Sequence, residues 1–433
     1  MAYTSIVIPA TRDWKHTLLQ RFGDESHFVL LDSNADVSLG IDYTWIAAGG
    51  CLKEFTPTDK PLHSLRASRK EHPGWWFGRL SYDLKNQIEK LHSNNDDAFE
   101  WTEVRFFLAG WVMTSQNGEL TLHLHHDFGD FNHWKGLLSG WKARPRISQP
   151  VRLTPQMDRE AYINQAKSLL QHIHRGDIYE INFCQQFKAE GVEMDAVAVY
   201  SDLVDVASPP MAAFWHANNE WAISMSPERY LKKRGNRLIS QPIKGTAKRS
   251  SDEREDQQLA FDLRSSSKEQ AENVMILDLV RNDLSRVAER SSVEVTELFG
   301  IYSFKTVHQM ISTVEANLDA KSDMWDAIGA SFPMGSMTGA PKVSAMKLIE
   351  THENHKRGLY SGAIGYIKPN EDFDFNVVIR TILHDSDKKV VTVSVGSALT
   401  SLADPASEWE ECNIKLEALE KVLARGSSAG HSD

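Results

Sequence analysis

The sequence is poor in cysteine, has no excess of basic residues and contains no long apolar run. Three scattered cysteines, Cys51, Cys184 and Cys412, are too few for a disulfide framework or a cysteine-rich metal site, and they predict reduced thiols in a cytoplasmic protein. A formal net charge of -11 argues against nucleic-acid binding, because neutralising phosphates requires a basic surface. No apolar stretch has the length of a membrane span, and the first residues lack the basic segment of a signal peptide. We therefore expect neither a nucleic-acid nor a membrane partner.

The 433 residues exceed the usual size of one simple core, which predicts two domains or one large, intimately packed domain. Composition changes gradually near residues 141–150. Residues 1–145 are rich in tryptophan and are predicted to form strands at Phe28–Leu31, Trp75–Phe77, Phe106–Leu108 and Leu120–Leu124. Residues 150–425 alternate long helices with strands, and residues 426–433 are predicted to be a loose tail.

Three helices follow from apolar spacing and capping residues. They are expected over Arg159–His174, from about Ser267 to Glu289, and from Asp404 to Ala424, where Asp404-Pro405 supplies a cap followed by proline. A strand is expected over Ile178–Phe183, with Glu180 and Asn182 on one face.

Glu272 shares the apolar face of the second helix with Met275, Ile276 and Leu279. A carboxylate that faces the core is costly unless a cation or a proton compensates it. The sequence alone allows a structural ion pair with an arginine or a metal ligand at this position.

The third helix places Glu408, Glu411 and Lys415 within roughly 60° of one another, taking 100° per residue. A solvated helix face with a Glu411–Lys415 pair explains this pattern equally well, and taken alone it is the simpler explanation. Together with Glu272, an oxygen-only site for Mg²⁺ becomes credible, because Mg²⁺ binds a few carboxylates plus water and substrate oxygens.

Two further segments offer groups that bind anions. Gly335-Ser-Met-Thr-Gly-Ala-Pro-Lys342 does not match a phosphate-binding loop, but its backbone N–H groups and the Thr338 hydroxyl are candidates to face an anion, with a purely structural turn as the alternative. Arg380 lies on the apolar run Phe375–Thr381, which is predicted to be a strand, and suits bidentate carboxylate binding.

Several ordered motifs resemble the chorismate-utilising enzymes. The resemblance is strong from Arg159 to Leu423 and looser before it. The motifs that carry it are, in order, Asp278-Leu-Val-Arg-Asn-Asp283 after Ala271-Glu272, Val307-His-Gln-Met-Ile-Ser-Thr313, Gly335 to Lys342, Tyr360-Ser-Gly-Ala-Ile-Gly-Tyr366 and Phe375 to Thr381. It implies an α+β sandwich of two large, mainly antiparallel sheets with helices outside.

The resemblance also implies the roles of individual residues. Glu272 and Glu411, with Glu408 close by, would hold Mg²⁺ against the ring carboxylate of chorismate. Glu228, in Ser226-Pro-Glu-Arg229, would protonate the departing C4 hydroxyl, and His308 would sit beside the ring. The enolpyruvyl carboxylate would be bound by Arg380, Tyr366 and backbone near Gly396, with Lys415 and Thr338 nearby.

Lys244 distinguishes branches of this family. Members that place ammonia directly on C2 carry alanine here, whereas Gln241-Pro-Ile-Lys-Gly-Thr246 resembles the branch that forms aminodeoxychorismate, the precursor of p-aminobenzoate and folate. Amination at C4 with retained configuration needs two displacements, which a nucleophilic lysine provides. Lys244 can act if desolvation or a nearby cation lowers its pKa so that the amine is neutral.

Two residues depart from the family pattern. Ala398 replaces a glycine in Gly396-Ser-Ala-Leu-Thr400, which bears on backbone contact with the substrate. Glu180 stands where related synthases often have glutamine and isochorismate-forming enzymes have lysine. An acid at this position would not activate water as that lysine does, which argues against isochorismate formation.

The chain has no segment that resembles a glutamine amidotransferase, so a separate amidotransferase subunit is expected to supply ammonia. The nearest rival function is that of anthranilate synthase component I. A second alternative is not an enzyme but a regulatory subunit that binds chorismate without turning it over. The presence of both an acid and a nucleophile argues against this alternative.

Overall fold

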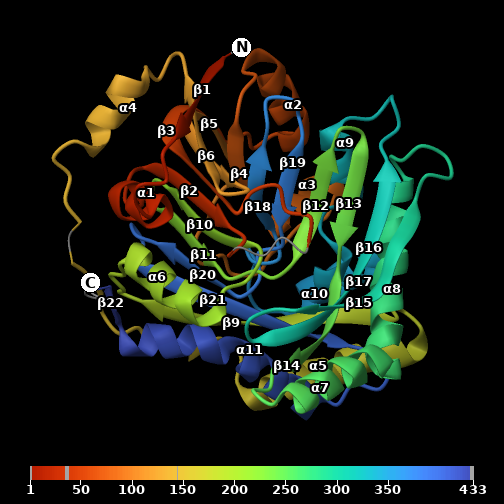
Figure 1. Cartoon of the computed structure of the whole chain (residues 1–433). Helices are drawn as coiled ribbons and strands as arrows, with labels where there is room; N and C mark the ends of the chain where they lie inside the picture. Colours follow the sequence, from red (N-terminus) through yellow and green to blue (C-terminus); the bar gives the residue numbers. More distant parts are fainter. Residues whose placement is uncertain (1, 35–38, 144, 430–433) are drawn as a thin grey trace.

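Two large antiparallel sheets meet at β5 (Val104–Gln116), whose edges have different partners (Figure 1). One edge pairs along its length with β3 (Trp45–Phe55). The other edge pairs first with β4 (Trp76–Leu80) and then with β6 (Glu119–His125). The predicted α+β fold with two large sheets is confirmed, with the added feature that the sheets share a strand and form one hydrogen-bonded network.

In the computed structural model, which describes residues 2–34, 39–143 and 145–429, each sheet combines distant parts of the chain. The first sheet continues from β3 through β2 (His27–Asp32), β10 (Ala212–Ala217), β11 (Glu220–Ser224), β20 (Thr381–Asp385), β21 (Val390–Leu399) and β9 (Glu180–Glu190). Three shorter or outer strands extend this sheet: β1 (Tyr3–Ile8) pairs with β6, and both β8 (Thr154–Pro155) and β17 (Gly339–Ala340) pair with β9. The second sheet continues from β4 through β18 (Ala363–Ile367), β19 (Phe373–Asn376), β12 (Arg229–Arg234), β13 (Arg237–Gln241) and β16 (Val307–Asn317), which also pairs with β14 (Ile243–Lys248) and β15 (Glu294–Ser303). Strands from the two predicted portions of the chain therefore pair directly, β2 with β10 and β4 with β18.

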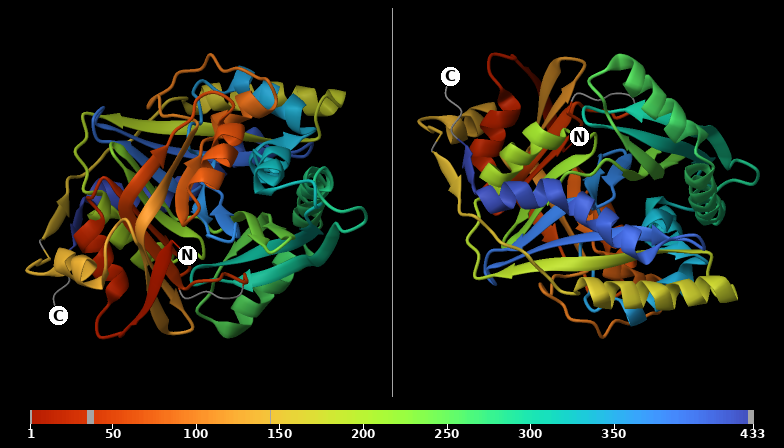
Figure 2. Two further views of the ribbon diagram at one scale, coloured as in Figure 1. Left: turned by 90° about the horizontal axis from the view of Figure 1, so that it is seen from above. Right: turned by 90° about the horizontal axis from the view of Figure 1, so that it is seen from below.

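Helices cover the outer faces of both sheets, as the views in Figure 2 show. The first sheet carries α1 (Trp14–Phe22), α4 (Phe131–Leu138), α5 (Arg159–Arg175), α6 (Ala196–Ala207), α10 (Lys342–His352) and α11 (Pro405–Arg425). The second carries α2 (Pro61–Glu71), α7 (Glu253–Ser265), α8 (Ser267–Ser285) and α9 (Met324–Ser331), while η1 (Tyr82–Leu84), α3 (Lys85–Ile88) and η2 (Gly335–Met337) are short connections. A third apolar core, which includes Phe77, Phe107 and Trp215, fills the space between the sheets. None of the described helices is long and apolar enough to cross a membrane.

The predicted helices are present; α5 and α11 agree with the predicted bounds to within one residue at each end, and α8 is shorter than predicted. Asp404 caps α11 by accepting a hydrogen bond from the Ser407 N–H, and α5 ends at Gly176, whose φ of 82° suits glycine. Helix α8 ends at Ser285 rather than at Glu289. Beyond the helix the N–H groups of Arg286 and Val287 close tighter turns onto Asp283 and Leu284, and the Glu289 N–H donates to the carbonyl of Asn317, 2.7 Å away.

The predicted strand over Phe375–Thr381 is wrong, because the chain crosses from one sheet to the other within this segment. Strand β19 of the second sheet ends at Asn376, and β20 of the first sheet begins at Thr381. Between them the N–H of Val377 donates to the carbonyl of Glu228, and Arg380 adopts a φ of 50°. An apolar run buried on all sides carries no periodicity that would reveal such a crossing.

The chain end also differs from the prediction. Ser427–Ala429 form β22, which pairs with β7 (Arg146–Ser148), so this part is not a loose tail. Main-chain pairing explains the difference, because it requires no apolar side chains. Residues 430–433 lie outside the described residues.

A buried ion pair ties the two sheets together. Arg79 of β4 donates two hydrogen bonds of 2.7 Å to the carboxylate of Glu220 on β11, and both side chains are at most 1% exposed. Removing one partner of such a pair leaves the other charge buried without compensation.

We therefore expect Glu220→Gln to lower the free energy of unfolding by about 3–5 kcal/mol, measured by urea denaturation. Glu100→Gln is the matched control, because Glu100 is 75% exposed in its pair with Lys388 and should matter by less than about 1 kcal/mol. Equal losses in the two variants would contradict the tie between the sheets.

Candidate active site

Lys244 is held in an irregular part of β14 and points into the protein. The pairing of β14 with β16 shifts register between Ile243 and Thr246, and Gly245 adopts a φ of 91°. Such a bulge redirects the neighbouring side chain. The Lys244 side chain is 10% exposed, and its Nζ lies 2.5 Å from Oε1 of Glu180 at the start of β9.

The carboxylates around Lys244 act on its pKa. Burial opposes the positive charge of Lys244, but the carboxylate of Glu180 raises the pKa of the lysine above its ordinary value. Glu272 and Glu228 add to this effect. The condition of a lowered pKa, under which Lys244 could act as a neutral amine, is therefore not met without substrate, because the lysine faces carboxylates instead of a cation.

Glu228 lies immediately before β12 and is almost fully buried. Its Oε1 accepts a hydrogen bond of 2.6 Å from the Ser336 hydroxyl. Burial raises the pKa of Glu228 to about 7, although Ser336 and the charge of Lys244 act in the opposite direction. Glu228 can therefore hold and donate a proton near neutral pH, as a general acid must.

Arg380 lies at the crossing between the sheets and close enough to Glu228 for their charges to interact. Burial lowers the pKa of Arg380, and the charge of Glu228 partly offsets this effect. Among the described residues, no side-chain partner is hydrogen-bonded to its guanidinium, whose planar donors suit a carboxylate.

Three carboxylates gather where α8 and α11 approach β14. Glu272 and Glu408 are buried, whereas Glu411 is half-exposed and pairs with Lys415 at 2.6 Å. Burial raises the pKa of Glu272 to about 7, because the charge of Lys244 offsets it only in part. Burial and the neighbouring Glu411 likewise raise the pKa of Glu408.

This carboxylate cluster fits a hard cation such as Mg²⁺, which binds carboxylate oxygens together with water. Glu272 is a buried acid whose nearest ion-pair partner, Lys268, lies 3.9 Å away. Its raised pKa reflects a charge that a cation would compensate. The oxygens of the three glutamates do not all lie within 4.8 Å of one another in this structure; among the described residues, the group that meets this distance is His125, His126 and Asp127.

Lys415 and Gly396 are joined directly, because Nζ of Lys415 donates a hydrogen bond of 2.9 Å to the Gly396 carbonyl. A Cβ at position 396 would lie 2.5 Å from Oδ1 of Asn182 and from Sγ of Cys184, so a larger residue there would displace these side chains. The Thr338 hydroxyl is fully buried and donates to carbonyls of its own turn, those of Met334 and Gly335.

Two predicted residues have other surroundings. Both ring nitrogens of His308 are engaged, by the Ser303 hydroxyl at 2.8 Å and by Asp256 of α7 at 3.0 Å, so the ring ties α7 to β16. Tyr366 lies between the sheets, where its ring contacts Tyr43, Trp75 and Phe77.

The structure does not bring Tyr366 to the cluster around Lys244. It lines a small cavity between the sheets with Ser33, Tyr43 and Asp374, and Asp374 binds Arg229. Glu228, which precedes Arg229 in the chain, does not line this cavity; its carboxylate accepts a hydrogen bond from Ser336 of η2.

Sequence reasoning missed Ser336 and Lys268 as members of the site, and it did not pair Glu180 with Lys244. Ser336 belongs to the Gly-rich segment Gly335–Lys342, and its hydroxyl there is a signal that the sequence offers. Lys268 precedes Glu272 by one helical turn, a spacing at which a Lys–Glu pair is expected.

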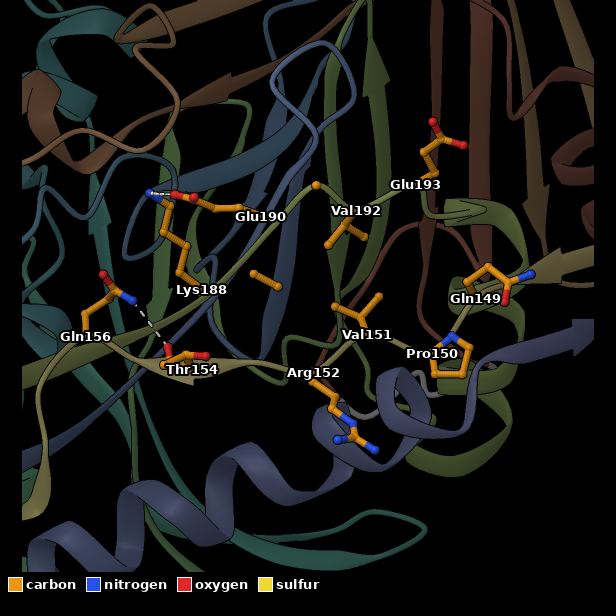
Figure 3. A pocket seen from close by; sticks show the side chains of 12 residues that line it. Gln149, Pro150, Val151, Arg152, Thr154, Gln156, Lys188, Glu190, Val192 and Glu193 are labelled. Atoms are coloured by element: carbon orange, nitrogen blue, oxygen red, sulfur yellow. Dashed lines mark hydrogen bonds and ion pairs between the residues drawn. The ribbon is translucent and has the colours of Figure 1, made fainter.

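A larger, polar groove opens at the other end of β9 (Figure 3). It is lined by Val151, Arg152 and an ion pair between Lys188 and Glu190 at 2.6 Å. None of the predicted site residues lines it, so we assign the chemistry to the cluster around Lys244.

Fold and site together define an α+β sandwich protein with a buried amine, a proton-holding acid and a set of carboxylates that fit a cation. The family model of the chorismate binding enzymes matches residues 26–421. The chain therefore belongs to the chorismate-binding enzyme family.

Individual relatives agree with this assignment. Aminodeoxychorismate synthase component 1 of Escherichia coli is 31% identical over 391 residues, which cover 86% of this chain and 84% of that protein. The probable chloroplastic aminodeoxychorismate synthase of rice (Oryza sativa subsp. japonica) is 33% identical over 413 residues, and the chain spans only 46% of its length. The crystal structure of anthranilate synthase component I from Streptococcus pneumoniae superposes with a TM-score of 0.76 at 23% identity, covers 92% of both chains and shows the common fold.

Proposed function

We propose that the chain converts chorismate and ammonia to 4-amino-4-deoxychorismate through a covalent intermediate on Lys244, for p-aminobenzoate and folate synthesis. The observation that carries the proposal is a buried Lys244, in the Pro-Ile-Lys-Gly-Thr motif, whose charge interacts with those of Glu228 and Glu272. The relative from Escherichia coli named aminodeoxychorismate synthase component 1 supports the same activity.

The reaction proceeds in two displacements. The Lys244 amine adds to C2 of the ring as the bond between C4 and its hydroxyl oxygen breaks, and Glu228 donates the proton with which that hydroxyl leaves as water. Ammonia then adds to C4 as the bond between C2 and the lysine nitrogen breaks. Two successive displacements retain the configuration at C4.

The remaining site residues hold the substrate. Arg380 binds the enolpyruvyl carboxylate with its uncommitted donors. Lys415, Gly396 and Thr338 keep the supporting positions that the family resemblance implies for them. Glu272, Glu408 and Glu411 would hold Mg²⁺, which supplies positive charge against the ring carboxylate. His308 positions α7 against β16 through its hydrogen bonds with Asp256 and Ser303. A separate amidotransferase subunit supplies the ammonia.

The test is to incubate the protein with chorismate, Mg²⁺ and ammonium and to identify the product by chromatography and mass spectrometry. We expect aminodeoxychorismate. Anthranilate as the main product would overturn the proposal in favour of anthranilate synthase component I, whose fold the chain shares. No turnover would favour a regulatory subunit that binds chorismate.

Glu272→Gln is expected to weaken Mg²⁺ binding by about tenfold or more, because it removes one carboxylate from the set. The binding constant is measured by calorimetry with MgCl₂ alone. Asp278→Asn on the same helix is the matched control, since Asp278 is 65% exposed and pairs with Arg281. Equal Mg²⁺ affinities of the two variants would exclude Glu272 as a ligand.

A further inference from the structure

Glu180 is a buried acid whose only ion-pair partner among the described residues is the lysine that the proposed function makes the nucleophile. Its side chain is 1% exposed, and Oε1 lies 2.5 Å from Nζ of Lys244. The second oxygen, Oε2, is buried and has no hydrogen-bond partner among the described residues. Strand β9 fixes this geometry, because Glu180 pairs there with Ala340 of the Gly-rich turn.

An ammonium ion has no lone pair, so Lys244 must lose a proton before it can attack carbon. Bulk water is a poor acceptor here, because the lysine side chain is only 10% exposed. The proton therefore needs an acceptor within the protein, and an acceptor must lie within hydrogen-bond reach.

Resting on the proposed function, we propose that Glu180 is the base that takes a proton from Lys244 before attack on C2 and returns it after the product forms. The other nearby carboxylates have different tasks. Glu228 is bound to Ser336 and must itself be protonated to release the C4 hydroxyl as water. Glu272 belongs to the carboxylate cluster that would hold Mg²⁺.

The proton balance closes over one cycle. Lys244 begins as an ammonium beside a Glu180 carboxylate, and proton transfer gives a neutral amine beside a carboxylic acid. Attack of the amine on C2 forms the carbon–nitrogen bond as the bond between C4 and its hydroxyl oxygen breaks. Glu228 donates its proton to that oxygen, which leaves as water. Ammonia then adds to C4, the lysine leaves as a neutral amine, and the new C4 amine gives one proton back to Glu228. Glu180 finally returns its proton to Lys244.

The test is Glu180→Gln, which keeps the shape of the side chain but cannot accept the proton. We expect aminodeoxychorismate formation at pH 7 to fall by about 100-fold, a typical contribution of a general base. The variant-to-wild-type rate ratio should rise about tenfold per pH unit between pH 6 and 9, because Lys244 must then lose its proton to solvent. Taking the ratio removes the pH dependence of Glu228 from the comparison.

Two further variants separate chemistry from folding. Glu180→Asp keeps a carboxylate and should restore a pH-independent ratio. Glu190→Gln at the other end of β9 removes an exposed glutamate paired with Lys188 and should leave the rate unchanged.

A constant ratio in Glu180→Gln, or a rate at pH 7 equal to that of the wild type, would overturn this inference alone. Anthranilate from the wild-type protein would instead overturn the proposed function, and the role of Glu180 with it. Thermal unfolding of each variant shows whether it is folded.

Discussion

Lys244→Ala is expected to lower aminodeoxychorismate formation by at least about 100-fold, because the covalent route then has no nucleophile. The wild-type protein given chorismate and Mg²⁺ without ammonia should also acquire a mass increase equal to chorismate less water on the peptide that contains Lys244. The alanine variant should acquire none. Rates are measured by product chromatography and adducts by mass spectrometry of the digested protein.

Lys248→Ala is the matched control for this variant, because Lys248 lies on the same strand and is exposed. We expect it to retain the wild-type rate. Unchanged turnover in Lys244→Ala would remove Lys244 from the mechanism, even if aminodeoxychorismate were the product. Unfolding must be measured in parallel, since the substitution leaves Glu180 buried without its ion-pair partner.

Glu228→Gln is expected to lower the rate by about 10²–10⁴-fold, because an amide cannot donate the proton that the departing hydroxyl needs. The pH dependence has a definite sign. Glu228 is active when protonated, and its pKa of about 7 predicts that kcat/KM of the wild-type protein falls as pH rises through 7. This decline should be absent from the residual activity of Glu228→Gln.

Glu294→Gln serves as the control for Glu228, since Glu294 is an exposed glutamate on β15. It should keep both the rate and the decline at high pH. A wild-type profile in Glu228→Gln would assign the decline to another group and would remove Glu228 as the acid.

Local features of the fold were predictable because they depend on nearby residues. The α5 and α11 ends follow from Gly176 and Asp404, which act on backbone groups a few residues away. The crossing at Arg380 and the pairing of β22 with β7 were not predictable, because each depends on strands remote in sequence. The same holds for β5, whose membership of both sheets leaves no trace in its own residues.

The family resemblance names the residues of the candidate site, but it does not give their pairings. Resemblance identified Glu228, Lys244, Glu272 and Arg380, and the charge interactions among them show that the structure gathers these groups. It did not reveal that Lys244 faces Glu180, because β9 and β14 are far apart in the chain. Tyr366 was expected to bind substrate, but its ring packs between the sheets against Tyr43. Its position in a motif does not tell which face of the strand its side chain occupies.

The shared strand β5 has a consequence for how the chain reaches its native state. Its neighbour β3 leads through β2 to β10, and β4 leads to β18, so both sheets depend on contacts between residues far apart in sequence. Such topologies fold slowly, and strand edges that are still unpaired during folding promote aggregation. A fragment that begins near residue 150 would expose the edges of β10 and β18, so we expect it to aggregate unless residues 1–145 are supplied with it.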